Sequence, residues 1–150
     1  MANTHTRLLH HCIWSTKDRL PLISRDVQER IWAYLAGIAK ENRIHPIRIG
    51  GIENHIHVLI DLPKTMTISE AMKRMKGGSS KWIHAERILA GKFQWQDGYA
   101  AFSVSPSNVD AVAEYIAKQR EHHRTRSFED ELVALLEKHG VEFDPKYLWG

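Results

Sequence analysis

Two histidines, His55 and His57, lie one residue apart in the stretch HIHVLIDL (55–62), which is otherwise typical of a buried strand. Successive side chains of a strand point to opposite faces, so both imidazoles share one face and Ile56 points to the other. Two imidazoles at this spacing can bind one divalent cation. A lone His-x-His pattern is weak evidence, however, because a polar strand face can carry histidine without binding anything. The pair therefore indicates a metal site only if the fold adds a third ligand and a reacting group.

The helical segment VDAVAEYIAKQREHH (109–123) offers candidates for both groups. At 100° per residue, its apolar stripe consists of Val109, Val112, Ala113 and Ile116. Tyr115 and Gln119 are spaced i and i+4, and they therefore lie together on the flank of that stripe. A single helix tyrosine more often packs at the edge of a core, so Tyr115 alone favours a structural role. Beside the histidine pair, the phenol and the carboxamide become candidates for a nucleophile and a third ligand.

The elements that must position these side chains follow the order β-α-β-β-α-β, with two further helices. Periodicity, caps and turn residues predict strands over 6–15, 44–52, 55–62 and 99–105, and helices over 24–42, 67–90, 107–124 and 129–140. The candidate helix caps are Ser24, Ser107, Ser127 and Gly140. Gly50-Gly51 predicts a bulge or tight bend, and Gly77-Gly78 predicts a kink or a close approach. This order predicts an α+β fold, a ferredoxin-like split antiparallel sheet with helices on one face, followed by the tyrosine helix and a short final helix.

The chain has the composition of an ordinary globular domain. Its 150 residues are 43% hydrophobic and 26% charged, and the formal net charge is +3. We expect one domain over residues 1–150, with a core of about 6–126 and a C-terminal helix and tail over 127–150. The single cysteine, Cys12, excludes a disulfide framework, and no stretch reads as a signal peptide or a membrane span. These features predict a cytoplasmic protein that does not enter a membrane.

Basic residues cluster in KRMKGGSSKW (73–82) and KQREHHRTR (118–126). Runs of this kind are more often solvated helix faces than binding sites, so charge alone does not assign them a partner. If the partner is a nucleic acid, the candidates for phosphate contacts are Lys73, Lys76, Lys81, Arg120 and Arg124.

Taken as an ordered set, these motifs resemble the single-tyrosine HUH transposases of small bacterial insertion sequences, a family that includes relatives associated with repetitive palindromes. HIH matches the histidine–hydrophobic–histidine signature, and YIAKQ matches the tyrosine motif with its Tyr-x-x-x-Gln spacing. The segments STKDRLP, MKGGSSKW and WQDGYAAFSVS also resemble family segments, so the resemblance spans nearly the whole chain. One residue departs from the pattern, because Asn54 stands before the first histidine where the family often has Asp.

The resemblance implies a DNA transposase that cleaves and rejoins single-stranded DNA. Tyr115 would attack a backbone phosphorus, giving a 5′-phosphotyrosine link and a free 3′-hydroxyl. His55, His57 and the carbonyl oxygen of Gln119 would hold Mg²⁺ or Mn²⁺. The implied partners are single-stranded DNA with hairpin (palindromic) ends and a second copy of the chain, and a nucleoid-associated location follows. Whether the tyrosine acts in its own subunit or across a dimer stays open.

Other functions remain compatible with the sequence. A non-catalytic single-stranded nucleic-acid binding module on the same fold would not need Tyr115. A domesticated transposase with a housekeeping role would keep the same chemistry. A zinc-dependent hydrolase would need an acidic general base beside the metal, and the nearest acids along the chain, Glu53 and Asp61, are poorly placed for that role.

Overall fold

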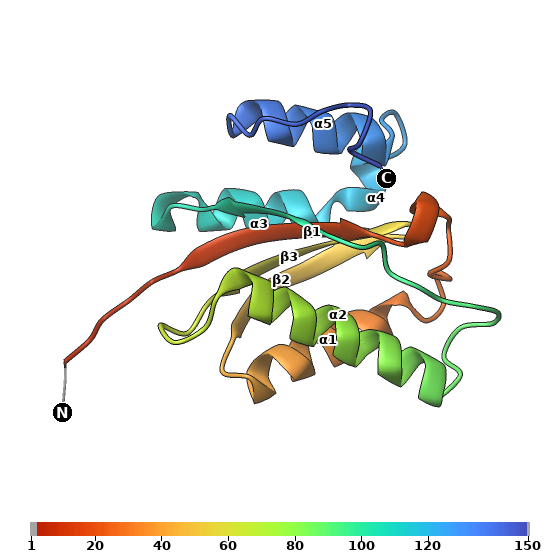
Figure 1. Ribbon diagram of the computed structural model, residues 1–150, viewed down its shortest axis with the longest axis horizontal. Helices are drawn as coiled ribbons and strands as arrows, with labels where there is room; N and C mark the ends of the chain where they lie inside the picture. Colours follow the sequence, from red (N-terminus) through yellow and green to blue (C-terminus); the bar gives the residue numbers. More distant parts are fainter. Residues whose placement is uncertain (1–2, 150) are drawn as a thin grey trace.

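A four-stranded antiparallel sheet forms the centre of the molecule, as the sequence predicts; the computed structural model describes residues 3–149 (Figure 1). The strands are β1 (Leu9–Ser15), β2 (His45–Ile52), β3 (His55–Asp61) and β4 (Ala100–Ser103). Their spatial order is β2-β3-β1-β4, so the histidine-bearing strand β3 has a partner on each side. The predicted α+β class and the split order of the sheet are confirmed.

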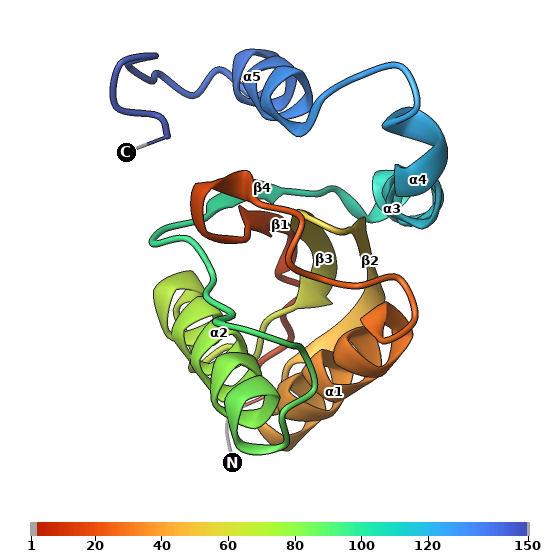
Figure 2. The same cartoon turned by 90° about the vertical axis from the view of Figure 1, so that its right-hand side faces the viewer.

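Helices cover both faces of this sheet (Figure 2). Helices α1 (Gln28–Glu41) and α2 (Ile68–Ala85) pack on one face, where they bury the apolar row Ile56, Val58 and Ile60 of β3 in the main core. Helices α3 (Val109–Ala117), α4 (Gln119–His122) and α5 (Phe128–Lys138) lie over the other face (Figure 1). The 3-10 turns η1 (Lys17–Arg19) and η2 (Pro106–Asn108) follow β1 and β4. The face that carries the histidines is thus closed by the C-terminal third of the chain.

Cap residues decide several helix ends. Ser127 accepts a hydrogen bond from the backbone N–H of Asp130 at 3.1 Å, and Gly140, at φ +66°, follows the end of α5, as predicted. Helix α1 begins later than predicted, because the Ser24 carbonyl accepts from the N–H of Val27 (3.2 Å) in a turn before the helix. The predicted Ser107 cap is wrong, since η2 precedes α3 there.

Gly50, Gly51 and Gly78 are sites of close packing, whereas Gly77 is not. Helix α2 runs unbroken through Gly77-Gly78, and a Cβ on Gly78 would lie 3.0 Å from Cδ1 of Ile38 on α1. The register irregularity of β2 lies between Pro46 and Arg48, so the bulge predicted at Gly50-Gly51 is misplaced. Among the helices of residues 3–149, none is long and apolar enough to cross a membrane.

Candidate active site

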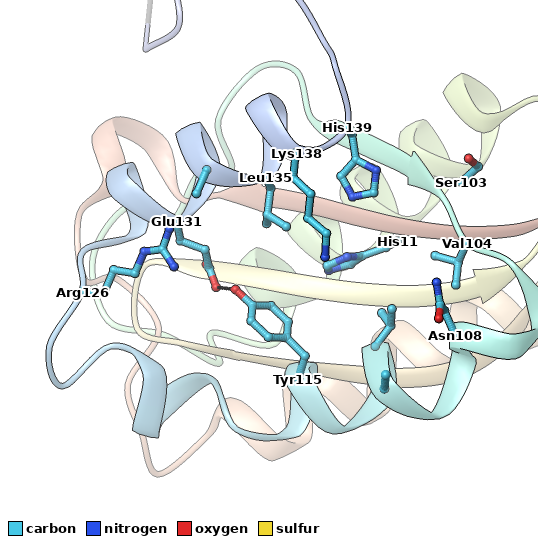
Figure 3. Close-up of a pocket in the computed structure, with 13 residues that line it drawn as sticks. His11, Ser103, Val104, Asn108, Tyr115, Arg126, Glu131, Leu135, Lys138 and His139 are labelled. Carbon is cyan, nitrogen blue, oxygen red and sulfur yellow. Dashed lines mark hydrogen bonds between the residues drawn. The ribbon is translucent and has the colours of Figure 1, made fainter.

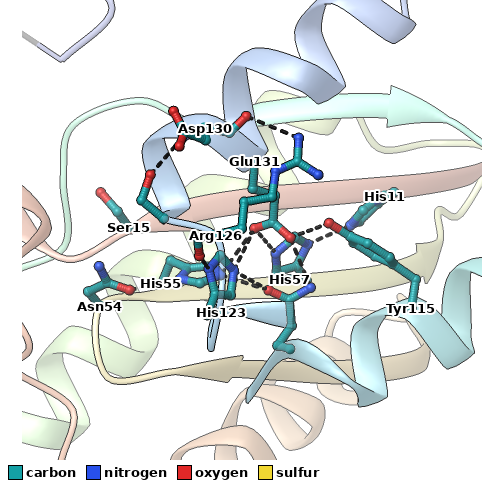
Figure 4. A network of polar contacts seen from close by, with 12 residues as sticks. His11, Ser15, Asn54, His55, His57, Tyr115, His123, Arg126, Asp130 and Glu131 are labelled. Atoms are coloured by element: carbon teal, nitrogen blue, oxygen red, sulfur yellow. Dashed lines mark hydrogen bonds and ion pairs between the residues drawn. The ribbon is translucent and has the colours of Figure 1, made fainter. Parts of the chain in front are cut away.

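The two histidines of β3 are held by their Nδ1 atoms. Both side chains are fully buried, on the face covered by α3–α5 (Figure 4). The Nδ1–H of His55 donates to Oδ1 of Asn54 at 2.8 Å, so Asn54 provides the acceptor that an Asp would provide. Nδ1 of His57 lies 2.8 Å from Nε2 of His11 on β1. Ligating histidines are commonly oriented by a hydrogen bond to the other ring nitrogen, and here that leaves both Nε2 atoms directed to one point.

Gln119 and Glu131 meet the histidines at that point. Oε1 of Gln119 lies 2.8 Å from Nε2 of His55. Oε1 of Glu131 lies 3.3 Å from Nε2 of His55 and 3.1 Å from Nε2 of His57. The amide of Gln119 donates to the other oxygen of Glu131 at 3.1 Å, so the two side chains fix each other. His55, His57 and Glu131 form a candidate metal site in which all three side chains are buried.

Tyr115 reaches the same cluster from α3 of the same chain. Its hydroxyl donates a hydrogen bond to Oε2 of Glu131, the carboxylate that also contacts both histidines (Figure 4). The close approach of α3 to β2 depends on Gly50, because a Cβ there would lie only 2.7 Å from the carbonyl oxygen of Ile116. The side chain of Tyr115 is partly buried, beside a cavity between α3 and α5.

Burial and the shared carboxylate set the protonation states of the cluster. Burial alone would raise the pKa of Glu131, but the contacts of its carboxylate with the imidazoles of His123, His55 and His57 hold that pKa well below its usual range. Burial lowers the pKa of His55 to about 4, although Glu131 opposes the shift. Burial, the hydrogen bond to Glu131 and the charge of that carboxylate raise the pKa of Tyr115. At neutral pH the cluster therefore contains a carboxylate, a neutral His55 and a protonated phenol.

The donor set fits a divalent cation. Because Nδ1 of His55 keeps its proton for Asn54, the Nε2 atom of the neutral ring has a lone pair, and it faces the oxygens of Gln119 and Glu131. A cation between these acceptors would stabilise the contact, and burial disfavours the imidazolium. In octahedral Mg²⁺ coordination, bonds of about 2.1 Å place neighbouring donor atoms about 3 Å apart. The observed separations of 2.8, 3.1 and 3.3 Å match this spacing.

Glu131 is the site residue that the sequence analysis missed, since the acids considered there are Glu53 and Asp61. Glu53 instead pairs with Arg120 (2.8 Å), and Asp61 accepts from the backbone N–H of Leu8 (2.9 Å). Glu131 shares the buried stripe of α5 with apolar residues: Phe128, Leu132 and Leu136. An acid is rarely buried without a partner, so its place on an apolar stripe is the signal that could have identified it.

The basic residues do not converge on the cluster. Lys73, Lys76 and Lys81 lie on α2, across the sheet from the histidines, and Arg120 and Arg124 lie on the α4 side. Lys76 donates to the carbonyl oxygens of Gln96 (2.8 Å) and Gly98 (2.6 Å). Lys73, Lys81 and Arg124 are exposed. Their contacts with phosphates stay predictions.

The family of the chain follows from comparison with known proteins. A family model described as "Transposase IS200 like" matches residues 4–119, well over half of the chain. The chain belongs to the family of IS200-like transposases. The resemblance inferred from the motifs is thereby confirmed. Within the matched residues lie His55, His57, Tyr115 and Gln119, whereas Glu131 lies beyond them.

Relatives and solved structures agree with this assignment. The IS200-like chain is 24% identical to the ISDra2 transposase TnpA of Deinococcus radiodurans over 121 residues, which cover 77% of this chain and 86% of that protein. It is 23% identical to the transposase for insertion sequence element IS200 of Salmonella typhimurium over 130 residues, covering 83% and 84% of the two chains.

Two solved structures share the fold. A crystal structure of a candidate transposase from Deinococcus radiodurans R1 superposes with a TM-score of 0.62 at 22% identity, covering 79% of this chain and 95% of the other. A REP-associated tyrosine transposase, solved bound to a REP hairpin, superposes with a TM-score of 0.57 at 13% identity, covering 82% and 74%.

Proposed function

We propose that this IS200-like transposase cleaves and rejoins single-stranded DNA through a 5′-phosphotyrosine intermediate, with Tyr115 as the nucleophile. The observation that carries the proposal is the position of the Tyr115 hydroxyl, which is hydrogen-bonded to the carboxylate that joins His55 and His57. The solved relative bound to a REP hairpin supports DNA with hairpin ends as the substrate, and such a substrate would place the protein at the nucleoid.

Each residue of the cluster has its own proposed role. His55, His57 and Gln119 would hold Mg²⁺ or Mn²⁺, and the carboxylate of Glu131 would add a fourth donor to this mixed set of nitrogen and oxygen atoms. The bound cation would offset the charge of the non-bridging phosphate oxygens and polarise phosphorus. Asn54 and His11 keep both rings oriented through their Nδ1 atoms.

The covalent step balances without any further reactant. A bond forms between the Tyr115 oxygen and phosphorus, and the bond from phosphorus to the 3′-oxygen breaks. The hydroxyl proton of Tyr115, which is donated in a hydrogen bond to Oε2 of Glu131, passes to that carboxylate and on to solvent, and the departing 3′-oxygen takes up one proton from solvent. The phosphotyrosine diester keeps the energy of the broken bond, and the phenoxide is a better leaving group than an alkoxide, so rejoining can follow.

The arrangement within one chain supports a site that is complete in each subunit. The expected homodimer stays a prediction, and it is not needed to bring Tyr115 to the histidines. Sedimentation analysis measures whether the protein is a dimer, and adduct formation at low protein concentration measures whether a single subunit is active.

The test is covalent capture. The protein is incubated with labelled single-stranded hairpin oligonucleotides and Mg²⁺ or Mn²⁺, and we expect a denaturant-resistant adduct that disappears with a chelator and in Tyr115→Phe. Tyr147→Phe is the matched control, because that tyrosine is 68% exposed. A Tyr115→Phe protein that still forms the adduct would exclude the proposed nucleophile.

One observation favours a second candidate, a metal-dependent hydrolase. Glu131 supplies the carboxylate beside the histidine pair that such an enzyme requires. A hydrolase would release both DNA ends free, and cleavage by Tyr115→Phe without any adduct would select it over the transposase.

A further inference from the structure

A cavity of about 460 Å³ lies between α3 and α5, directly beside Tyr115 (Figure 3). This volume falls within the range of about 300–1,000 Å³ that is usual for small-molecule sites. Tyr115, Glu131 and Arg126 lie toward one end of the cavity, and Val104 and Asn108 lie toward the other (Figure 3). The cavity therefore extends away from the histidine pair along the axis of the tyrosine helix.

The walls and the rim differ in chemistry. Opposite walls are apolar, with Ala111 and Val112 contributed by α3 and Ala134 and Leu135 by α5. The rim carries two cations, Arg126 and Lys138, and neither forms a salt bridge with any acid in the part of the chain that the structure describes. An apolar slot with unpaired cations at its rim suits a planar heterocycle attached to phosphates.

We propose that this cavity binds the base of one unpaired nucleotide that flanks the scissile phosphate. The inference rests on the proposed function, since it takes single-stranded DNA as the ligand. With the phosphorus at the Tyr115 hydroxyl, the adjoining nucleotide is the one that can enter between Val112 and Leu135. Arg126 contacts the phosphate at the tyrosine end, and Lys138 contacts the next phosphate along the strand. The consequence is a base preference at one position beside the cleavage site, read by a pocket of the protein.

The experiment measures binding without cleavage. Thymidine 3′,5′-bisphosphate, and the same bisphosphate lacking the base, are titrated into the full-length protein while methyl NMR signals of Val104, Val112 and Leu135 are followed. We expect saturable shifts of these methyls with the thymidine compound, and binding of the abasic compound weaker by about fivefold or more, because the base buries apolar surface against these walls. Equal affinity for the two compounds, or no shift of these methyls up to the solubility limit, would overturn the proposal.

Variants of α5 separate the cavity from the surface of the same helix. Ala134→Trp fills the cavity, and we expect it to abolish the difference between the two bisphosphates. Glu137→Trp adds the same ring to an exposed position of α5 outside the cavity, and it should bind both as the unaltered protein does. Thermal unfolding checks that each variant is folded. If Ala134→Trp does not fold, the comparison of the thymidine and abasic bisphosphates on the unaltered protein still tests the proposal. A preference retained in folded Ala134→Trp would reject the assignment.

The result of the bisphosphate titration does not depend on whether Tyr115 forms a covalent adduct with DNA. Base-dependent binding in the cavity combined with no Tyr115 adduct would reject the proposed function and keep a nucleotide site. A Tyr115 adduct combined with equal binding of the two probes would keep the proposed function and reject the site.

Discussion

Replacing Gly50 by alanine should displace the tyrosine helix while leaving the histidine pair in place. A Cβ at this position would lie 2.7 Å from the carbonyl oxygen of Ile116 and 3.1 Å from its Cγ2, whereas ordinary contacts begin at 3.4 Å. The oxygen belongs to the backbone of α3 and cannot rotate away, so the helix must move by about 0.7 Å to restore an ordinary contact. Ile116 is the neighbour of Tyr115, and the hydroxyl must move with it.

The size of the effect follows from the sensitivity of catalysis to placement. A misplacement of about 1 Å can lower a rate about 100-fold, so we expect Gly50→Ala to form the covalent adduct about 10- to 100-fold more slowly. Binding of Mn²⁺, measured by calorimetry, should change much less, because three of the four proposed donors, His55, His57 and Glu131, lie on β3 and α5, and only Gln119 follows the displaced helix. The expected signature is therefore a slower chemical step at nearly unchanged metal affinity.

The matched control is Gly77→Ala on α2. A Cβ there meets nothing within 4 Å, and alanine in a helix interior is more stable than glycine by about 0.5–1 kcal/mol. Adduct formation by Gly77→Ala should match the unaltered protein, with a slightly raised unfolding midpoint. If Gly50→Ala also formed the adduct at the control rate, the argument that this contact positions Tyr115 would be refuted.

Three further outcomes are expected. Glu131→Gln should weaken Mn²⁺ binding in calorimetry, because it removes the only carboxylate beside the histidines among the described residues. Asp130→Asn, at an exposed position of the same helix, should leave Mn²⁺ affinity unchanged. Equal affinities of the two variants would exclude Glu131 as a metal ligand. His11→Phe should weaken Mn²⁺ binding about 10- to 100-fold, because His57 loses the hydrogen bond that orients it and this is the usual cost of such a loss. Unchanged affinity would show that packing alone orients the His57 ring. Burial raises the pKa of the Cys12 thiol, so the folded protein should resist iodoacetamide at pH values where the unfolded protein is alkylated. A mass-spectrometric time course measures the labelling. Rapid labelling of the folded protein would contradict the prediction.

The sequence predicts those parts of the site that depend on local periodicity. The alternation of a strand is enough to put His55 and His57 on one face, and the i, i+4 spacing predicts that Tyr115 and Gln119 lie on one side of a helix. The predicted continuous helix is wrong in one respect, because α3 ends at Ala117 and α4 begins at Gln119. The family resemblance then joins strand and helix, and the structure places all four side chains around one point.

Glu131 depends on information of another kind. Its contact with β3 requires α5 to fold back across the sheet, and no periodicity specifies the path of the turn between His123 and Ser127. The role of Gly50 was missed for the same reason. A glycine in a strand reads locally as a bulge, but its actual neighbour is Ile116, 66 residues later in a helix. Long-range packing decides both cases.

The central place of β3 ties the ligand geometry to the pairing of the sheet. His57 is opposite Ile13 on one side and Gly50 on the other, and His55 is opposite Ser15 and Ile52. A slip of one residue would turn both imidazoles into the apolar layer beneath α1 and α2 and would bring Ile56 out in their place. An engineer who wished to relocate this pair along the strand could therefore move it only by an even number of residues, and the pleat of the strand fixes the spacing between the two rings.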